Sequence, residues 1–394
     1  MSMQISQRAN AVNPSATVAI NGKATQLKAQ GVDIINLSVG EPDFDTPQSI
    51  KDAAIQAINA GYTKYTAVDG IPALKDAIIG KFKTENQLSY TREQILVSCG
   101  AKQSLYNLTQ AILNPGDEVI IPAPYWVSYP AMVALAGGVN IIVKTDVSSR
   151  FKITAAQLEQ AITPKTRLLI LNSPSNPTGM AYNAEELKAL AAVLLKHPNV
   201  LIASDDMYEH ILWGINFFVN IVNVFPELID RTIVCNGVSK AYAMTGWRIG
   251  YAAGPVAIIK AMTKVQSHST SNPTSISQYA AIAGLNGEKE FIANLKIVFK
   301  ERHDFMQHEL SNIPGVICPP ADGAFYVFPN VEAAIKRHRL ADDVALSELI
   351  LEKAHVAVVP GTEFGAPGFI RLSYATNRQT LKSAVERMTP YISG

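Results

Sequence analysis

The sequence predicts an α/β fold, with a mostly parallel central sheet, helices on both faces and a smaller α+β domain. From about Gln94 to Gly254, short runs rich in β-branched residues alternate with amphipathic helical patterns, as in a parallel sheet covered by helices. The chain has 394 residues, more than a single hydrophobic core usually serves. We therefore expect an N-terminal arm with part of the small domain over 1–45, a large domain over 46–299 and a C-terminal small domain over 300–394.

The order of elements follows from these local patterns. The expected strands of the large domain are Gln94–Ser98, Glu118–Pro122, Asn140–Lys144, Arg167–Asn172, Val200–Asp205, Thr232–Asn236 and Arg248–Ala253. The expected helices are Lys102–Leu113, Ala184–Lys196, Val256–Val265, Ile276–Leu285 and Glu288–Leu310. Asn183 is suited to cap the helix that begins at Ala184, and Glu185 suits the positive end of its dipole. In the C-terminal part we expect strands at Val356–Val359 and Phe369–Tyr374 and a helix at Thr380–Met388.

Charge and cysteine content indicate small-molecule partners. Lys and Arg total 34 against 33 Asp and Glu, and no long block of one sign occurs, so nucleic acid and anionic membranes are not expected partners. Cys99, Cys235 and Cys318 form no CxxC pair and suit a reducing cytosol, and no metal site is expected. The N-terminus lacks an apolar signal region, and no stretch approaches the roughly 18 apolar residues of a membrane span. We expect a soluble, cytoplasmic protein.

An acid, a phenol, a lysine and an arginine follow one another between Asp205 and Arg248. Asp205 and Tyr208 lie in Ser-Asp-Asp-Met-Tyr at the end of a predicted strand, where open α/β sheets present ligand groups. Lys240 and Arg248 lie in Ser-Lys-Ala-Tyr-Ala-Met-Thr-Gly-Trp-Arg. In pyridoxal phosphate (PLP) enzymes a lysine forms a Schiff base with the cofactor, a carboxylate keeps the pyridine nitrogen protonated and an arginine holds the phosphate. The segment therefore predicts a PLP site.

The run that contains the lysine resembles the signature of fold type I PLP-dependent aminotransferases (class I/II), and more closely that of the bacterial aspartate aminotransferases. The resemblance extends from about Ser38 to Tyr374. It implies that Lys240 is the catalytic lysine and that Asp205 stabilises the protonated ring. Tyr208 and Asn176, the latter in Asn-Pro-Thr-Gly, are then expected to reach the 3-oxygen of the ring.

Further cofactor contacts are expected from two loops and from the lysine segment. Gly100, Ala101 and Lys102 lie where a predicted strand meets a helix, so their backbone N–H groups can receive the phosphate with the helix dipole behind them. A glycine at such a turn is common in α/β proteins, so this signal is only moderately specific. Ser239, next to the catalytic lysine, joins the predicted cofactor-binding residues. Trp126 resembles the aromatic residue that stacks on the pyridine ring, although a lone tryptophan is by default a core residue.

The resemblance also assigns residues to the substrate and to a second subunit. Arg371, in Phe-Ile-Arg-Leu-Ser-Tyr, matches the arginine for the substrate α-carboxylate, which its planar fork suits. Gly40, in Ser-Val-Gly-Glu-Pro, resembles the glycine whose main chain lines the same site. Tyr65 resembles the tyrosine that reaches the phosphate of the neighbouring subunit's cofactor. The resemblance thus implies a homodimer with shared active sites that acts on amino acids and 2-oxo acids.

Two departures from the family pattern bear on phosphate and substrate. Gly237 stands where many relatives carry a phosphate-binding serine, and Ser267 near where one subgroup carries an arginine for a distal carboxylate. A second substrate carboxylate needs a positive partner, and the resemblance to the bacterial branch assigns this role to Lys102. Arg8 falls where relatives that also transaminate prephenate have a basic residue. The predicted reaction is ping-pong transfer from L-aspartate to 2-oxoglutarate, giving oxaloacetate and L-glutamate, with conversion of prephenate to arogenate as a further activity.

Other interpretations stay open from the sequence. An aromatic, alanine or kynurenine aminotransferase, or a β-lyase, would share the cofactor residues and differ in the distal pocket. A non-catalytic PLP-binding regulator would need a DNA-binding domain, and the segment before Ser38 is neither long nor basic enough for one. A nicotinamide dehydrogenase is also α/β, but no GxGxxG follows a predicted strand. Taken singly, Lys102 could be a solvated lysine at a helix start and Arg8 an ordinary charge of the arm.

Overall fold

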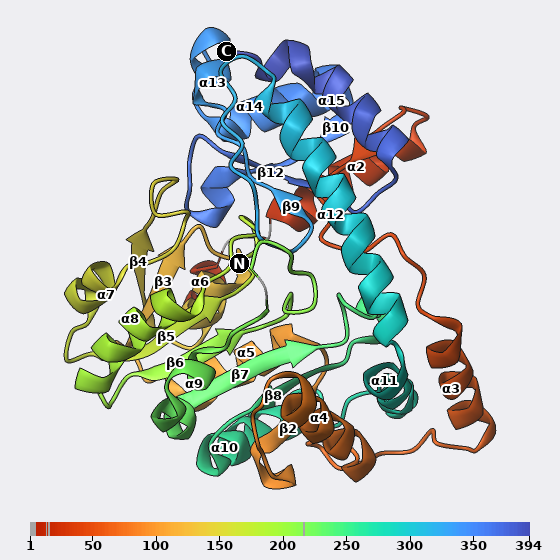
Figure 1. Cartoon of the computed structure of the whole chain (residues 1–394), viewed down its shortest axis with the longest axis vertical. Helices are drawn as coiled ribbons and strands as arrows, with labels where there is room; N and C mark the ends of the chain where they lie inside the picture. The colour runs from red at the N-terminus through yellow and green to blue at the C-terminus, as the bar shows by residue number, and fades with distance from the viewer. Residues whose placement is uncertain (1–4, 13, 15, 216) are drawn as a thin grey trace.

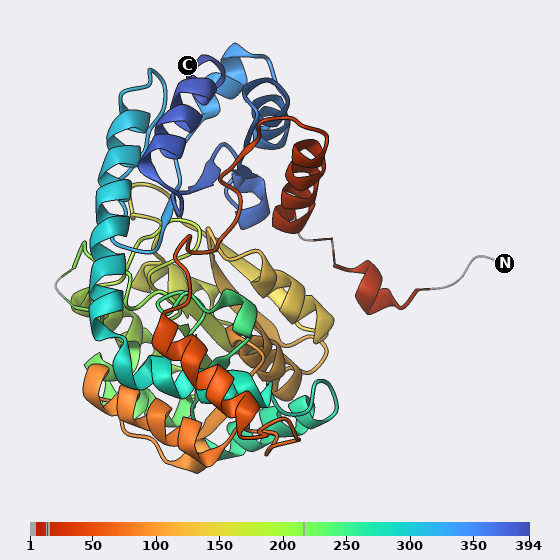
Figure 2. The ribbon, with the colours of Figure 1, turned by 90° about the vertical axis from the view of Figure 1, so that its right-hand side faces the viewer.

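The computed structural model describes residues 5–12, 14, 16–215 and 217–394, which form two lobes (Figures 1 and 2). The larger lobe is built on a seven-stranded sheet of order β2-β8-β7-β6-β5-β3-β4. β8 runs antiparallel to β2 and β7, and the other neighbours pair in parallel. The strands are β2 (Ile95–Ser98), β3 (Glu118–Ala123), β4 (Val139–Lys144), β5 (Thr166–Asn172), β6 (Leu201–Asp205), β7 (Thr232–Gly237) and β8 (Gly250–Ala253). The predicted α/β fold with a mostly parallel sheet is confirmed.

Helices cover both faces of this sheet. Consecutive strand residues point to opposite faces and are apolar, so both faces must be buried. Leu96 packs in one buried cluster and Val97 in the other. The cluster around Leu96 is covered by α5 (Ala101–Ile112), α6 (Ser128–Leu135) and α10 (Val256–Ser267). The cluster around Val97 is covered by α3 (Gln48–Asn59), α4 (Pro72–Glu85), α7 (Ala155–Ala161), α8 (Ala184–Lys196), α9 (Ile221–Val224) and α11 (Ser275–Gly287).

The smaller lobe combines short strands with helices from both ends of the chain. β9 (Tyr326–Val327), β11 (Val359–Pro360) and β12 (Ile370–Ser373) form an antiparallel sheet of order β11-β12-β9, and β1 (Ile35–Asn36) pairs in parallel with β10 (Val356–Ala357). Phe299, Phe325 and Tyr374 lie in its buried core. Its helices are α2 (Ala16–Ala29), α13 (Glu332–Arg337), α14 (Asp343–Leu349) and α15 (Arg378–Ile392), and α1 (Gln7–Asn10) lies in the arm before them. The predicted α+β character of this lobe follows from these elements.

A single long helix, α12 (Lys289–Ser311), runs from the larger lobe into the smaller one (Figure 1). Leu295 already packs in the core of the smaller lobe, so the boundary expected between 299 and 300 falls inside a continuous helix. We propose to keep 1–45, 46–299 and 300–394 as the three segments of the two lobes. The first and last segments belong together because β1 pairs with β10. Among the helices formed by the described residues, none combines the length and hydropathy of a membrane-spanning segment.

Most expected elements end within one or two residues of the observed ones, and α8 matches its prediction at both ends. The Asn183 side chain accepts a hydrogen bond from the Glu186 N–H, as a cap should. Two expectations were wrong. The strand expected at Val356–Val359 is divided between two sheets, and Arg248 does not begin β8 but has a left-handed backbone with φ of 57°.

Candidate active site

A cavity of about 410 Å³ lies at the carboxyl ends of β5 and β6 and after β7, between the two lobes. Lys240, Asp205 and Tyr208 line it from the larger lobe, and Arg371 lines it from β12 of the smaller one. Gly40, which follows β1, lines it as well. The structure therefore brings together residues that are far apart in the sequence and that the sequence assigned to one site.

Lys240 lies in the turn that follows β7, is partly buried and lines the cavity. Its Nζ donates to the Gly40 carbonyl oxygen, and it forms no ion pair with a described carboxylate. Burial lowers its pKa to about 8, with Arg371 and Arg248 acting in the same direction and Glu41 opposing them. A lysine that loses its proton this easily has a neutral, nucleophilic amine available near physiological pH.

Asp205, the last residue of β6, is buried and faces the cavity. The Tyr129 hydroxyl donates to its Oδ2 at 2.5 Å, and the Met207 N–H donates to its Oδ1 at 3.3 Å. Burial raises its pKa to about 6, and the hydrogen bond from Tyr129 opposes that rise. The carboxylate is therefore poised to pair with a cationic ligand group, because such a partner would relieve the cost of its burial.

The N-terminus of α5 forms a seat for an anion. Gly100 has φ of 88°, and a Cβ there would overlap the Arg248 guanidinium. Two hydrogen bonds fix the Arg248 guanidinium. Its Nη1 donates to the Thr245 carbonyl oxygen at 2.9 Å and its Nη2 to the Cys99 carbonyl oxygen at 3.1 Å. Ala101 lines the cavity at the first turn of the helix. An arginine and a helix N-terminus at one point are the groups that hold a phosphate.

Two residues of the lysine segment complete this end of the site. Ser239 is buried and lines the cavity beside the lysine. Gly237, one of the departures from the family pattern, has little room for a side chain, since a Cβ would lie 3.0 Å from both the Gly250 Cα and the Ile249 carbonyl oxygen. Close packing of β7 against β8 accounts for the glycine.

Arg371 forms the opposite end of the cavity. Its Nη1 donates to Asn176 Oδ1 at 2.9 Å and its Nη2 to the Ser38 carbonyl at 2.6 Å. The guanidinium carbon lies 4.5 Å from the ring centre of Tyr326 and 5.1 Å from that of Phe364. The buried Nε has no hydrogen-bond partner among the described residues. Arg371 lines the cavity, and the planar fork of a guanidinium suits a carboxylate.

The mouth of the cavity is lined by an aromatic residue and a second lysine. Lys102 Nζ lies 4.9 Å from the ring centre of Trp126, and both residues line the cavity. Burial of part of the Lys102 side chain lowers its pKa, and the charge of Arg248 adds to this. Tyr65 and Arg8 do not line this cavity. Tyr65 is 91% exposed, and Arg8 is exposed on α1, in the arm that extends from the body in Figure 2.

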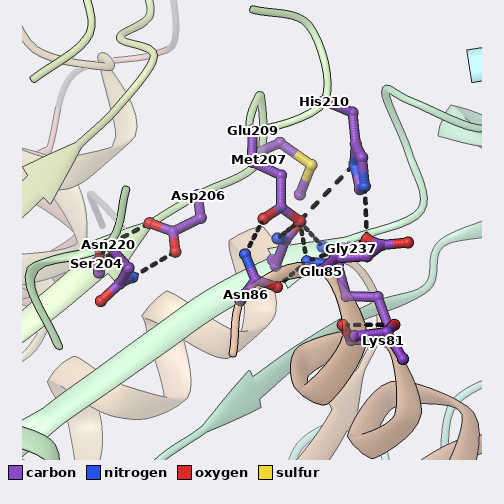
Figure 3. A network of polar contacts seen from close by, with 12 residues as sticks. Lys81, Glu85, Asn86, Ser204, Asp206, Met207, Glu209, His210, Asn220 and Gly237 are labelled. Atoms are coloured by element: carbon purple, nitrogen blue, oxygen red, sulfur yellow. Dashed lines mark hydrogen bonds and ion pairs between the residues drawn. The ribbon is translucent and has the colours of Figure 1, made fainter. Parts of the chain in front are cut away.

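A buried polar network lies on the other side of the strand end (Figure 3). Asp206 accepts from the Ser204 hydroxyl at 2.7 Å and from Asn220 Nδ2 at 2.6 Å. Glu209 forms an ion pair with Lys81. Two amides also bind Glu209, as Asn86 Nδ2 and Asn236 Nδ2 each donate to its carboxylate at 2.6 Å. The network fastens the turn after β6 to the end of β7, four residues before the lysine of the cavity.

Sequence reasoning did not single out Tyr129, Tyr326, Asn172 or Ser38. Asn172 closes β5, donates to the Asp205 carbonyl oxygen at 2.9 Å and accepts from the Asn176 N–H at 2.8 Å. Its position at a strand end was the available signal. Tyr129 is three residues from Trp126 in the sequence, and Tyr326 lies on the strand that pairs with β12, which carries Arg371. Only the tertiary fold brings both tyrosines to the cavity.

A partly buried lysine without an ion pair, beside a carboxylate in a cleft, is typical of an α/β enzyme that acts through an amine nucleophile. Residues 32–388 match the model of the family described as aminotransferase class I and II, and the chain belongs to this family. It is 54% identical to the aspartate/prephenate aminotransferase of Nitrosomonas europaea, over 99% of this chain and 100% of the relative. It is 53% identical to the aspartate aminotransferase of Geobacillus stearothermophilus, over 98% of each chain.

Solved structures agree with these relatives. The aspartate aminotransferase of Rhizobium meliloti superposes with a TM-score of 0.94 at 46% identity, over 99% of each chain. The aspartate aminotransferase of Thermus thermophilus, solved with maleate, gives a TM-score of 0.94 at 44% identity, over 99% of this chain and 100% of that one. The fold and the aminotransferase family are thereby established for this chain.

Proposed function

We propose that the cavity binds PLP, with Lys240 as the residue that holds it covalently. The observation that carries the proposal is the lysine with a pKa of about 8 between a buried carboxylate and an anion seat. When bound, PLP supplies an electron sink for the bonds of the substrate α-carbon. Asp205 would pair with the ring nitrogen, Arg248 and the α5 N-terminus would hold the phosphate, and Tyr208 and Asn176 would donate to the ring oxygen. Ser239 and Trp126 would complete the cofactor contacts.

Within this site, we infer that the chain transfers the amino group of L-aspartate to 2-oxoglutarate by a ping-pong mechanism, giving oxaloacetate and L-glutamate. Arg371 would bind the α-carboxylate with its planar guanidinium against the main chain of Gly40, and Lys102 would bind the side-chain carboxylate. Lys240, once released by the incoming amine, would remove the proton from the substrate α-carbon and deliver it to the cofactor carbon that carries the amino nitrogen. The Thermus thermophilus aspartate aminotransferase was solved with maleate, a dicarboxylate, which supports a site with two anion-binding ends.

We propose a homodimer in which Tyr65 completes the partner's phosphate site. Ile55, Ile58, Tyr62 and Tyr65 are large hydrophobic residues, each at least 47% exposed, on α3 and the loop that follows it. An apolar patch of this kind is typical of an interface. Prephenate is a second proposed substrate, because the Nitrosomonas relative is named for it, and Arg8 is the basic residue of the arm that would take part.

The visible spectrum of the purified, PLP-supplied protein tests the cofactor and the donor together. We expect L-aspartate, added without a 2-oxo acid, to replace the absorption of the lysine-bound cofactor by that of its amino form. A band that aspartate leaves unchanged would keep the cofactor and refute the donor, and no band at all would refute the proposal. Lys102→Gln should lower kcat/KM for aspartate by about 10- to 100-fold and leave that for alanine within about threefold. Lys188→Gln, at an exposed lysine of α8, is the control.

A further inference from the structure

Tyr326 joins the two ends of the cavity. It lies on β9 opposite Ser373 of β12, the strand that carries Arg371. Its hydroxyl oxygen is 2.8 Å from that of Tyr208, which belongs to the larger lobe, and its ring stacks on the Arg371 guanidinium at 4.5 Å. Both tyrosines are buried. One side chain therefore contacts a residue proposed for the cofactor and a residue proposed for the substrate carboxylate.

The Tyr326 hydroxyl also fills the space beside Gly40. A Cβ at Gly40 would lie 2.5 Å from this oxygen, which is too close for a real contact. The Gly40 carbonyl oxygen in turn accepts from Lys240 Nζ. The hydroxyl is thus fixed between the main chain that holds the lysine and the phenol of Tyr208, and it has little freedom to turn away.

The direction of the hydrogen bond between the two phenols decides what Tyr208 can do. Each neutral phenol has one proton to donate. Burial raises the pKa of both, so both keep that proton near neutral pH. Among the described residues, the Tyr208 oxygen is the one hydrogen-bond partner of the Tyr326 hydroxyl, and the guanidinium above its ring has donors only. When Tyr326 donates to Tyr208, the Tyr208 proton is free to point into the cavity.

We propose that Tyr326 is a positioning residue that directs and strengthens proton donation by Tyr208. The inference rests on the proposed function, in which Tyr208 donates to the ring oxygen of PLP. Accepting a hydrogen bond polarises the Tyr208 O–H and makes it a better donor. A better donor stabilises negative charge on the ring oxygen, and this lowers the pKa of the nitrogen through which Lys240 holds the cofactor. Tyr326 acts on that pKa without touching the nitrogen.

The pH dependence of the visible absorption of the PLP-loaded protein measures this pKa. In Tyr326→Phe, which keeps the ring under Arg371, we expect the midpoint to rise by about half a pH unit, as for one weakened neutral hydrogen bond. Tyr208→Phe removes the direct donor and should raise it further. Adding Tyr326→Phe to Tyr208→Phe should then change nothing, because a residue that acts through Tyr208 has no effect without it.

Tyr374→Phe is the matched control, since this buried phenol of the same lobe donates to the Ala324 carbonyl oxygen and not to Tyr208. It should leave the midpoint unchanged, and thermal unfolding with PLP stoichiometry checks that each variant folds and loads. An unmoved midpoint in Tyr326→Phe, or an equal shift in both backgrounds, would overturn the inference. Wild-type protein that takes up no PLP would refute the proposed function instead, so the two failures are distinguishable.

Discussion

Two lysines lie on opposite sides of the end of β6, and their surroundings differ in one respect. The Lys81 side chain is fully buried and forms an ion pair with Glu209, to which two amides also donate. Lys240 is partly buried, but it contacts a carbonyl oxygen and forms no ion pair with a described carboxylate, and its pKa falls to about 8. Burial with a partner makes a lysine structural, and burial without one makes it reactive.

Two adjacent acids also lie on these two sides. Asp205, the last residue of β6, lines the cavity, and Asp206, which follows the strand, bonds to residues of the network. Burial raises the pKa of both, to about 6 for Asp205 and about 7 for Asp206. Asp206 has donors from Ser204 and Asn220 on both oxygens. Asp205 also has a donor on each oxygen, so what separates the two acids is the cavity, which Asp205 lines and Asp206 does not.

Replacing each lysine in turn gives the largest expected effects. Lys240→Ala should lower turnover by at least about 10⁴-fold while the variant stays folded, since it loses a buried amine that has no counter-charge. Lys81→Met should lower the free energy of unfolding by about 3–5 kcal/mol, because Glu209 is left buried and unpaired, with little change in turnover per folded molecule. Steady-state assays and denaturant unfolding measure both quantities.

The double variant Lys81→Met/Glu209→Leu serves as the control, since removing both charges should recover part of the lost stability. Normal turnover in Lys240→Ala would refute its catalytic role. A large loss of turnover in folded Lys81→Met would show that the network does more than hold the turn.

Much of this contrast was accessible from the sequence, because the family motif marks Lys240 and Asp205 and strand periodicity places them at the sheet edge. Lys81 was not singled out, and α4, the helix that carries it, was not among the expected elements. Its partner Glu209 is 128 residues away. The same holds for Tyr326 and Tyr208, which are separated by 118 residues. A local pattern identifies the chemistry of a residue, and the partner that tunes it comes from the tertiary fold.

Replacing each of the two acids in turn should have smaller effects, and it compares the cavity side with the network side once more. The pKa of Asp205 is raised on folding, so the stability it contributes is complete below about pH 4 and is lost as pH rises through about 6. Asp205→Asn should therefore stabilise the cofactor-free protein at pH 8 by about 1–3 kcal/mol while lowering turnover by at least about 100-fold. Asp206→Asn removes a charge one residue away on the network side and should keep turnover within about tenfold.

Unfolding of the cofactor-free proteins at pH 4 and pH 8 checks the sign. The stabilisation should vanish at pH 4, where both forms of residue 205 are neutral. A variant that is less stable than wild type at pH 8 would mean that Tyr129 and Met207 already compensate the buried charge.

The smallest expected effect concerns the pKa of Lys240 itself. The rate at which cofactor-free protein binds PLP should rise with pH and level off above about 8, well below the roughly 10.4 of an ordinary lysine, after correction with a simple amine measured in the same buffers. Glu41 is the anion that opposes the shift, so Glu41→Gln should move the midpoint to lower pH. A midpoint near 10 would mean that burial does not lower the pKa of Lys240, and its proposed difference from an ordinary lysine would be lost.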